Sequence, residues 1–265
     1  MKLATFVSGS DARVGVVEGD RIAPVTNHPD MLSLIEAGPT ALAKLKTGTP
    51  LALQGVRLLA PIPRPPRIRD FLCFELHVRQ SRANRHLFGL GTERLDPAKV
   101  EIARVWYERP VYYKGNPFSV VGHDAVVHWP AYSRIIDYEL EIGLVIGRGG
   151  KNLSRAAALE HVFGYTVFND FSARDEQYIE MQGTLGPAKG KDFDTGNAFG
   201  PWITTADEVG DPQDLDMTAR INGETWSRGN SGTMKHSFAD IVAFASLEET
   251  IYPGEILGSG TVGGG

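Results

Sequence analysis

Acidic residues occupy every second position in a short stretch that runs into an apolar segment. The stretch is Asp137-Tyr138-Glu139-Leu140-Glu141, and the apolar segment is Ile142–Ile146. Because alternate residues of a β-strand lie on one face, Asp137, Glu139 and Glu141 are predicted to project together, while the residues between them face the core. Three like charges in one row repel each other and destabilise a sheet. A bound cation would relieve that repulsion, and a half-buried strand with a hydrated acidic face is the alternative.

Three other segments carry polar side chains in apolar or turn-rich surroundings. These side chains are Asp70, Glu75 and His77 in the run 70–77, Asp170 in 168–175, and Lys189 and Lys191 in 185–194. Carboxylate oxygens suit hard divalent cations such as Mg²⁺, Mn²⁺ or Ca²⁺. We therefore expect one ion to be held by the set Asp70, Glu139, Glu141 and Asp170. Plainer interpretations stay open: Asp170 as a helix cap, His77 as a core histidine, and the lysines as solvated loop charges.

The elements that position these residues are predicted to be mostly strands. Strands are expected at 111–113, 125–128, 138–146, 164–169, 202–204 and 217–221, and helices at 78–88, 154–162, 172–181 and 238–246, with a loop at 89–97. Because regular crossover helices do not separate the strands, a doubly wound sheet is not expected. The glycines at 147, 149 and 150 lack the G-x-G-x-x-G spacing, so no nucleotide cofactor is expected either.

The N-terminal part has the pattern of a separate small unit. Residues 1–25 set apolar residues among turn signals, which predicts β-hairpins, and short helices are expected at 31–37 and 41–46. The proline-rich segment 61–66 is expected to be extended and semi-rigid. We therefore predict a small β-rich domain over residues 1–60 and a larger domain over 61–265.

Composition restricts the class of protein. The chain has 265 residues, 42% of them hydrophobic, and a net charge of -5, so it can bury an ample core and has no overall basic character for nucleic acid or an anionic membrane. Its single cysteine, Cys73, allows no intrachain disulfide and is expected to be a small buried hydrophobe. The N-terminus does not match a signal peptide, and no apolar run reaches the roughly eighteen residues of a membrane span. A cytoplasmic protein is predicted.

Taken in order, a series of motifs makes the chain resemble the fumarylacetoacetate hydrolase superfamily from about Arg69 to Gly265. The motifs are Tyr138-Glu139-Leu140-Glu141 with Val145-Ile146-Gly147, Gly164-Tyr165-Thr166, Asn169-Asp170-Phe171-Ser172-Ala173-Arg174-Asp175, Gly190-Lys191-Asp192-Phe193, Gly200-Pro201-Trp202, Asn222-Gly223-Glu224 and Gly258-Ser259-Gly260-Thr261. Seven motifs in sequence make chance a poor explanation. The resemblance implies an α+β, mainly β protein: a mixed β-sandwich roll of that family's C-terminal domain type behind a small N-terminal β-rich domain. It also implies a homodimer.

The resemblance further implies a set of site residues. They are Asp70, Glu139, Glu141 and Asp170 as ligands of Mg²⁺ or Mn²⁺ (with Ca²⁺ as a further option), His77 and Lys191 as catalytic residues, and Arg174, Gln177 and Thr261 as substrate-binding residues. The expected partner is a small anionic keto-acid substrate.

Two features depart from the family pattern. Many smaller members have a glutamate three residues after the histidine, where this chain has Gln80, which cannot accept a proton as a carboxylate does. Glu75 is the expected catalytic substitute, because in an extended segment it would share the face of His77, two residues away. The family also continues through another strand or two, so the resemblance implies a continuation beyond Gly265.

The implied activity is metal-dependent hydrolysis of a C–C bond in acylpyruvate- or fumarylpyruvate-like β-dicarbonyl acids through a metal-bound enolate. His77 would activate the attacking water, and Lys191 would stabilise the developing oxyanion. The same chemistry serves decarboxylation or isomerisation of oxaloacetate-like keto acids, which is the second hypothesis. A binding domain with a purely structural cation is a hypothesis of another class, and it leaves the positions of His77 and Lys191 unexplained.

Overall fold

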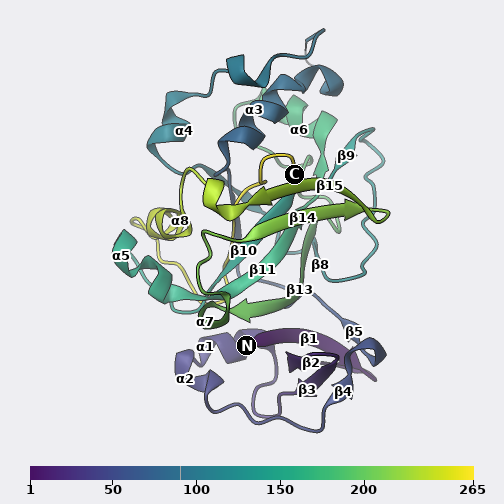
Figure 1. The fold of residues 1–265 in the computed structure, drawn as a ribbon, viewed down its shortest axis with the longest axis vertical. Helices are drawn as coiled ribbons and strands as arrows, with labels where there is room; N and C mark the ends of the chain where they lie inside the picture. The colour runs from purple at the N-terminus through teal and green to yellow at the C-terminus, as the bar shows by residue number, and fades with distance from the viewer. Residues whose placement is uncertain (90) are drawn as a thin grey trace.

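The computed structural model describes residues 1–89 and 91–265, so Leu90 of the predicted loop 89–97 lies outside the described residues. The protein is of the α+β class and mainly β, as predicted (Figure 1). In the described residues, a 12-stranded mixed sheet forms the framework, and two 2-stranded sheets accompany it. None of the described helices has the length and apolar character that crossing a bilayer requires.

The N-terminal strands extend the main sheet. β1 (Lys2–Ser8), β2 (Asp11–Glu18) and β3 (Arg21–Pro24) form an antiparallel meander, to which β4 (Leu51–Ala52) and β5 (Arg57–Leu58) are added. The short helices α1 (Met31–Glu36) and α2 (Pro39–Leu42) lie beside it (Figure 1). β1 also pairs with β13 (Asn197–Thr205), so strand pairing crosses the boundary predicted at residue 60. That boundary stays a prediction.

The strands that position the site lie in the second half of the main sheet. They are β6 (Ile68–Phe71), β7 (Tyr112–Gly115), β8 (Val120–Val121), β10 (Leu140–Ile146), β11 (Val162–Asp170), β13 and β16 (Ile256–Gly258). Neighbours follow the order β13-β11-β10-β16-β6-β7. β16, the last strand of the chain, therefore lies between β10 and β6, antiparallel to the first and parallel to the second.

Apolar side chains cover both faces of this half of the sheet. Val145, Phe168 and Ile256 belong to one hydrophobic cluster, whereas Leu144 and Leu257 belong to another. This division follows from the alternation of side chains along a strand. Cys73 is buried within the second cluster, as predicted.

Helices and a hairpin surround the sheet (Figure 1). The remaining elements are α3 (Glu75–Ala83), α4 (Arg104–Glu108), β9 (Ile136–Asp137), α5 (Arg155–Ala158), β12 (Ser172–Ala173), α6 (Arg174–Met181), α7 (Ala206–Val209), β14 (Asp216–Ile221), β15 (Glu224–Asn230) and α8 (Phe238–Ala245). α8 begins where a capping box predicts it, because Ser237 and Asp240 each bond the backbone N–H of the other. α3 and α6 stand together at one end of the molecule in Figure 1.

Several predicted elements are wrong in part or in whole. The helix expected at 41–46 is replaced by α2, which ends at Leu42, and the helix expected at 172–181 begins only at Arg174, after β12. Segment 125–128 forms no strand, and Val126 is 70% exposed, so its β-branched residues have no sheet to join. The predicted strand 138–146 is interrupted: β9 ends at Asp137 and β10 begins at Leu140. The predicted helix 78–88 begins earlier, at Glu75, and ends at Ala83. β15 and β16 were not predicted, because β15 is largely polar and β16 is only three residues long.

Candidate metal centre and catalytic cavity

Carboxylates from three strands meet on one face of the main sheet. Glu141 is paired with Phe168, so Asp170, two residues along β11, lies on the same face. Asp70 on β6 is paired with Gly258 of β16, the strand between β6 and β10. Together with Glu139, these side chains are buried, and one ligand atom of each lies within 4.8 Å of the others. We call Asp70, Glu139, Glu141 and Asp170 the carboxylate cluster.

Gly258 leaves the space in which the carboxylate cluster forms. A Cβ atom at this position would lie 2.2 Å from Oδ1 of Asp70 and 3.0 Å from Oε2 of Glu141. Any larger residue at this last position of β16 would therefore push the carboxylates of the neighbouring strands apart. The backbone continues the site, because the N–H of Gly260 donates to Oε2 of Glu141 at 3.1 Å.

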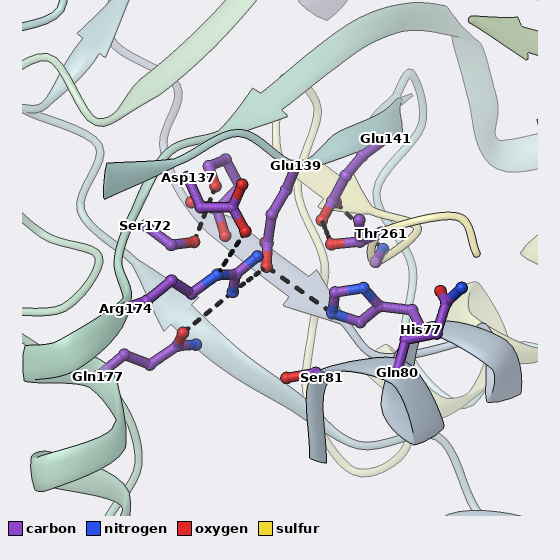
Figure 2. A network of polar contacts seen from close by, with 12 residues as sticks. His77, Gln80, Ser81, Asp137, Glu139, Glu141, Ser172, Arg174, Gln177 and Thr261 are labelled. Carbon is purple, nitrogen blue, oxygen red and sulfur yellow. Dashed lines mark hydrogen bonds and ion pairs between the residues drawn. The ribbon is translucent and has the colours of Figure 1, made fainter. Parts of the chain in front are cut away.

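Glu139 reaches the cluster because the strand is interrupted beside it. Its backbone N–H donates to the side-chain Oδ1 of Asn169 at 3.0 Å, outside the ladder of paired strands. Asp137 lies beyond the interruption and accepts a hydrogen bond from Nε of Arg174 at 2.9 Å. The expectation of one continuous acidic strand is therefore wrong, and Asp137 lies outside the carboxylate cluster (Figure 2).

Two buried cations contact the carboxylate cluster. Nζ of Lys191 donates to Oε2 of Glu139 and to Oδ2 of Asp170, both at 2.5 Å. Arg174, at the start of α6, donates from a terminal nitrogen to Oε1 of Glu139 at 2.6 Å. Although burial acts to lower it, the pKa of Lys191 is raised by these carboxylates, so the ammonium stays charged. Lys191 is 2% exposed, which excludes the interpretation as a solvated loop charge.

The carboxylate cluster carries more negative charge than these cations balance. Four carboxylates face two cations, which leaves a formal excess of two negative charges. Burial, with the neighbouring carboxylates, raises the pKa values of Asp70 and Glu141 well above their usual range. Burial also raises the pKa of Asp170 to about 6. Oδ1 of Asp70 and Oδ1 of Asp170 are buried without hydrogen-bond partners. Unpartnered oxygens and two uncompensated charges fit a hard dication.

His77 faces the carboxylate cluster from α3 (Figure 2). Its Nε2 lies 3.8 Å from Oε1 of Glu139. Burial lowers the pKa of His77 to about 4, helped by the charges of Arg174 and Lys191 and opposed by Glu139. At neutral pH the imidazole is therefore uncharged and can accept a proton.

The premise for Glu75 as the partner of His77 is wrong. Residues 75–83 form a helix, where residues two positions apart point in different directions. The Glu75 carboxylate instead accepts hydrogen bonds from Nε of Arg79 at 2.9 Å and from the hydroxyl of Tyr107 at 3.0 Å. Gln80, which occupies the position of the family's glutamate, accepts a hydrogen bond from the N–H of Gly264 at 2.8 Å.

The remaining predicted site residues line a cavity of about 900 Å³ that opens onto the carboxylate cluster. Thr261 donates to Oε1 of Glu141 at 3.2 Å. Gln177, one turn along α6 from Arg174, accepts a hydrogen bond from its guanidinium at 3.1 Å. Asp70, His77, Glu139, Glu141, Arg174 and Lys191 also line this cavity, and Asp170 lies fully buried behind them.

Tyr113 is a site residue that the sequence reasoning missed. Its hydroxyl donates to Oδ2 of Asp170 at 2.6 Å, and its ring lies 5.8 Å from Nζ of Lys191. It was predicted only as the end of a strand at 111–113. Nothing in that local pattern places β7 beside β6, which is the pairing that brings Tyr113 opposite Asp70.

Comparisons with known proteins agree on one family. The family model described as fumarylacetoacetate (FAA) hydrolase C-terminal matches residues 68–265, and the one described as Rv2993c-like, N-terminal, matches residues 1–61. A protein of Burkholderia cenocepacia (strain HI2424), named provisionally as a hydrolase, is 39% identical over an alignment 265 positions long, which covers 98% of this chain and 86% of that protein.

Solved structures of the same type cover the whole chain. Fumarylacetoacetate hydrolase from Exiguobacterium antarcticum has a TM-score of 0.75 and 28% identity, covering 100% of this chain and 87% of that one. Maleylpyruvate hydrolase from Sphingobium sp. SYK-6, in complex with manganese(II) and pyruvate, has a TM-score of 0.73 and 26% identity, covering 100% and 89%.

Proposed function

Because this chain belongs to the fumarylacetoacetate hydrolase superfamily, we propose that it is a metal-dependent hydrolase of small anionic keto acids. The reaction is cleavage of the bond between the acyl carbonyl carbon and the adjacent CH₂ carbon of an acylpyruvate- or fumarylpyruvate-like acid. The products are pyruvate and a carboxylic acid. The manganese and pyruvate in the Sphingobium relative support both the ion and the product.

One observation carries this proposal. The carboxylate cluster, with its formal excess of two negative charges, shares a cavity with an uncharged histidine and two buried cations. A purely structural ion would need the carboxylates but not a proton acceptor beside them. We therefore favour catalysis over a binding domain with a structural cation.

The carboxylate cluster would hold a Mg²⁺ or Mn²⁺ ion, which when bound supplies a Lewis acid for the negative charge on the departing fragment. Nε2 of His77 takes a proton from water, and the hydroxide adds to the acyl carbonyl carbon. Lys191 supplies positive charge near the oxygen that becomes negative. When the C–C bond breaks, its electron pair stays on the pyruvyl carbon, to which His77 returns the proton.

Arg174 and Gln177 orient the substrate from α6. The Arg174 guanidinium is held by Asp137 and Glu139, and its position in the cavity wall allows charge-assisted bonds to a substrate carboxylate. Thr261 fixes the orientation of Glu141 by its hydrogen bond. These positions require no movement of the main sheet.

Metal-dependent binding of oxalate tests the first half of the proposal. Oxalate resembles the planar enolate of pyruvate, so its affinity should rise at least about tenfold when Mg²⁺ or Mn²⁺ is present, measured by calorimetry. Equal affinity with and without the ion would remove the support for enolate chemistry. A panel of acylpyruvates, fumarylpyruvate and oxaloacetate, assayed for pyruvate release, then identifies the reaction.

A histidine variant tests the second half. His77→Asn should keep Mn²⁺ affinity and lose hydrolysis by roughly 10²- to 10⁴-fold, the usual contribution of a general base. The matched control is His128→Asn, since His128 is exposed outside the cavity. Hydrolysis at the wild-type rate in His77→Asn would remove this residue from the mechanism. Oxaloacetate turnover that survives the substitution would favour the decarboxylase hypothesis.

A further inference from the structure

The cavity that contains the carboxylate cluster has a second part, whose wall is apolar. Its side chains come from the segment after β6, from α3, from the start of β7, and from α6 with the loop that follows it. They are Leu72, Val78, Val111, Met181, Leu185 and Pro187. A substrate whose keto-acid end lies at Arg174 and Lys191 would extend its other end along this wall. The inference developed below therefore rests on the proposed function.

Two hydroxyl groups in the same wall, those of Ser81 and Tyr178, bond to each other's residues. The hydroxyl of Tyr178 donates to the backbone oxygen of Ser81 at 2.7 Å, and the Ser81 hydroxyl lies 2.7 Å from the Tyr178 oxygen. This pair joins α3 to α6. Because both hydroxyls already have partners, the wall offers little reward to a polar group on the substrate.

Leu185 is the most exposed large apolar side chain of the wall. It lines the cavity and is 98% exposed. The backbone on either side of it has positive φ, +64° at Thr184 and +111° at Gly186, so the chain turns sharply and presents Leu185 at the tip. The carboxylate of Glu180 anchors the far end of this loop by accepting the N–H groups of residues 188, 189 and 190 at 2.6 to 2.9 Å.

A second carboxylate on the substrate would need a cation at this end of the cavity. Arg174 and Lys191 are bound to the carboxylate cluster. Arg82 of α3 and Lys114 of β7 also line the cavity. The Arg82 guanidinium donates to the backbone oxygen of Glu101 at 2.8 Å, and Lys114 is exposed, so these two cations face six apolar side chains in this part of the cavity. An apolar distal group on the substrate therefore finds more contacts in this part of the cavity than a distal carboxylate does.

We propose that this chain selects keto acids whose distal group is uncharged and apolar, an alkyl or aryl acyl group, over those with a distal carboxylate. Leu185, Met181 and Pro187 form the specificity-determining side of the subsite. Transfer of alkyl carbon from water to such a wall favours binding by several-fold per methylene. Contact with the acyl group would also remove part of the exposed Leu185 side chain from water.

Binding of unreactive 2-oxo acids tests the subsite without relying on turnover. The probes are pyruvate, 2-oxooctanoate and 2-oxoadipate, titrated by calorimetry into the Mn²⁺-loaded protein. We expect 2-oxooctanoate to bind at least about tenfold more tightly than pyruvate, and 2-oxoadipate to bind no more tightly than pyruvate. Leu185→Ser should reduce the preference for 2-oxooctanoate several-fold while leaving the affinity for pyruvate unchanged. The matched control, Arg82→Gln, should leave both affinities unchanged.

The results distinguish failure of the proposed function from failure of the apolar subsite. If pyruvate and oxalate show no metal-dependent binding, the proposed function fails and the subsite fails with it. If they bind but 2-oxoadipate exceeds 2-oxooctanoate, and Arg82→Gln abolishes that advantage, the subsite selects a dicarboxylate and this inference is overturned while the proposed function stands. Equal affinities for pyruvate and 2-oxooctanoate would overturn it in the same way.

Discussion

Replacing Gly258 by alanine tests whether the carboxylate cluster is a metal site. The new Cβ would lie 2.2 Å from Oδ1 of Asp70, whereas real Cβ contacts are essentially never closer than 3.0 Å. The Asp70 carboxylate must therefore retreat by about 0.8 Å, the difference between these distances. Gly258 has no positive φ, so the backbone itself accepts alanine without strain.

A displacement of this size is large for a metal ligand and moderate for a folded core. Metal–ligand distances tolerate changes of only about 0.2 Å, so Asp70 would be lost as a ligand. We expect Mn²⁺ affinity to fall by about 10- to 100-fold, as for loss of a residue that orients a ligand. Overpacking should cost about 1–3 kcal/mol of stability.

Gly15→Ala is the matched control. Its Cβ would lie 2.5 Å from Ile22 and 2.8 Å from Phe6, a similar crowding within the N-terminal strands. Both variants should lose similar stability in thermal unfolding followed by circular dichroism, but only Gly258→Ala should lose Mn²⁺ affinity in calorimetry. Wild-type affinity in a folded Gly258→Ala protein would refute the assignment of the cluster as the metal site.

Three further predictions use the charges of the same site. Glu141→Gln should lose Mn²⁺ affinity by more than about 100-fold yet keep or raise the melting temperature of the metal-free protein, because it removes a buried acid whose ionisation is opposed by burial and by the neighbouring carboxylates; a lower melting temperature would contradict this. Lys191→Met should lose about 10² to 10³ in kcat, the usual size for one charge-stabilising group, while Mn²⁺ affinity holds or rises; parallel loss of both would make Lys191 a structural residue. The metal-free protein should become less stable as pH rises from about 6.5 to 8.5, above the ordinary pKa of histidine, because Asp70 and Glu141 have raised pKa values when folded and are already ionised when unfolded. Saturating Mn²⁺ should abolish that slope in thermal unfolding, and a stability that rises with pH in its absence would show that these carboxylates are not buried together.

The local sequence was sufficient for features that depend on a few neighbouring residues. The alternation at 137–141 predicted that Glu139 and Glu141 lie together, and both belong to the carboxylate cluster although β10 begins only at Leu140. The helix predicted at 238–246 forms as α8, and Ser237 and Asp240 cap its first turn. The order of the motifs also predicted the family and the mainly β class, because the motifs contain residues typical of turns and strand ends.

The tertiary structure decided which strands are neighbours, and a local sequence pattern carries no information about strand order. Asp70 and Glu141 meet only because β16, from the far end of the chain, separates β6 from β10 with a glycine at the contact. Residues 75–83 are helical although their first half looked extended, which turned Glu75 away from His77. Tyr113 joined the site through the pairing of β7 with β6. The sequence specifies the chemistry of each side chain directly. The distance between residues far apart in the chain depends instead on how the whole sheet is packed.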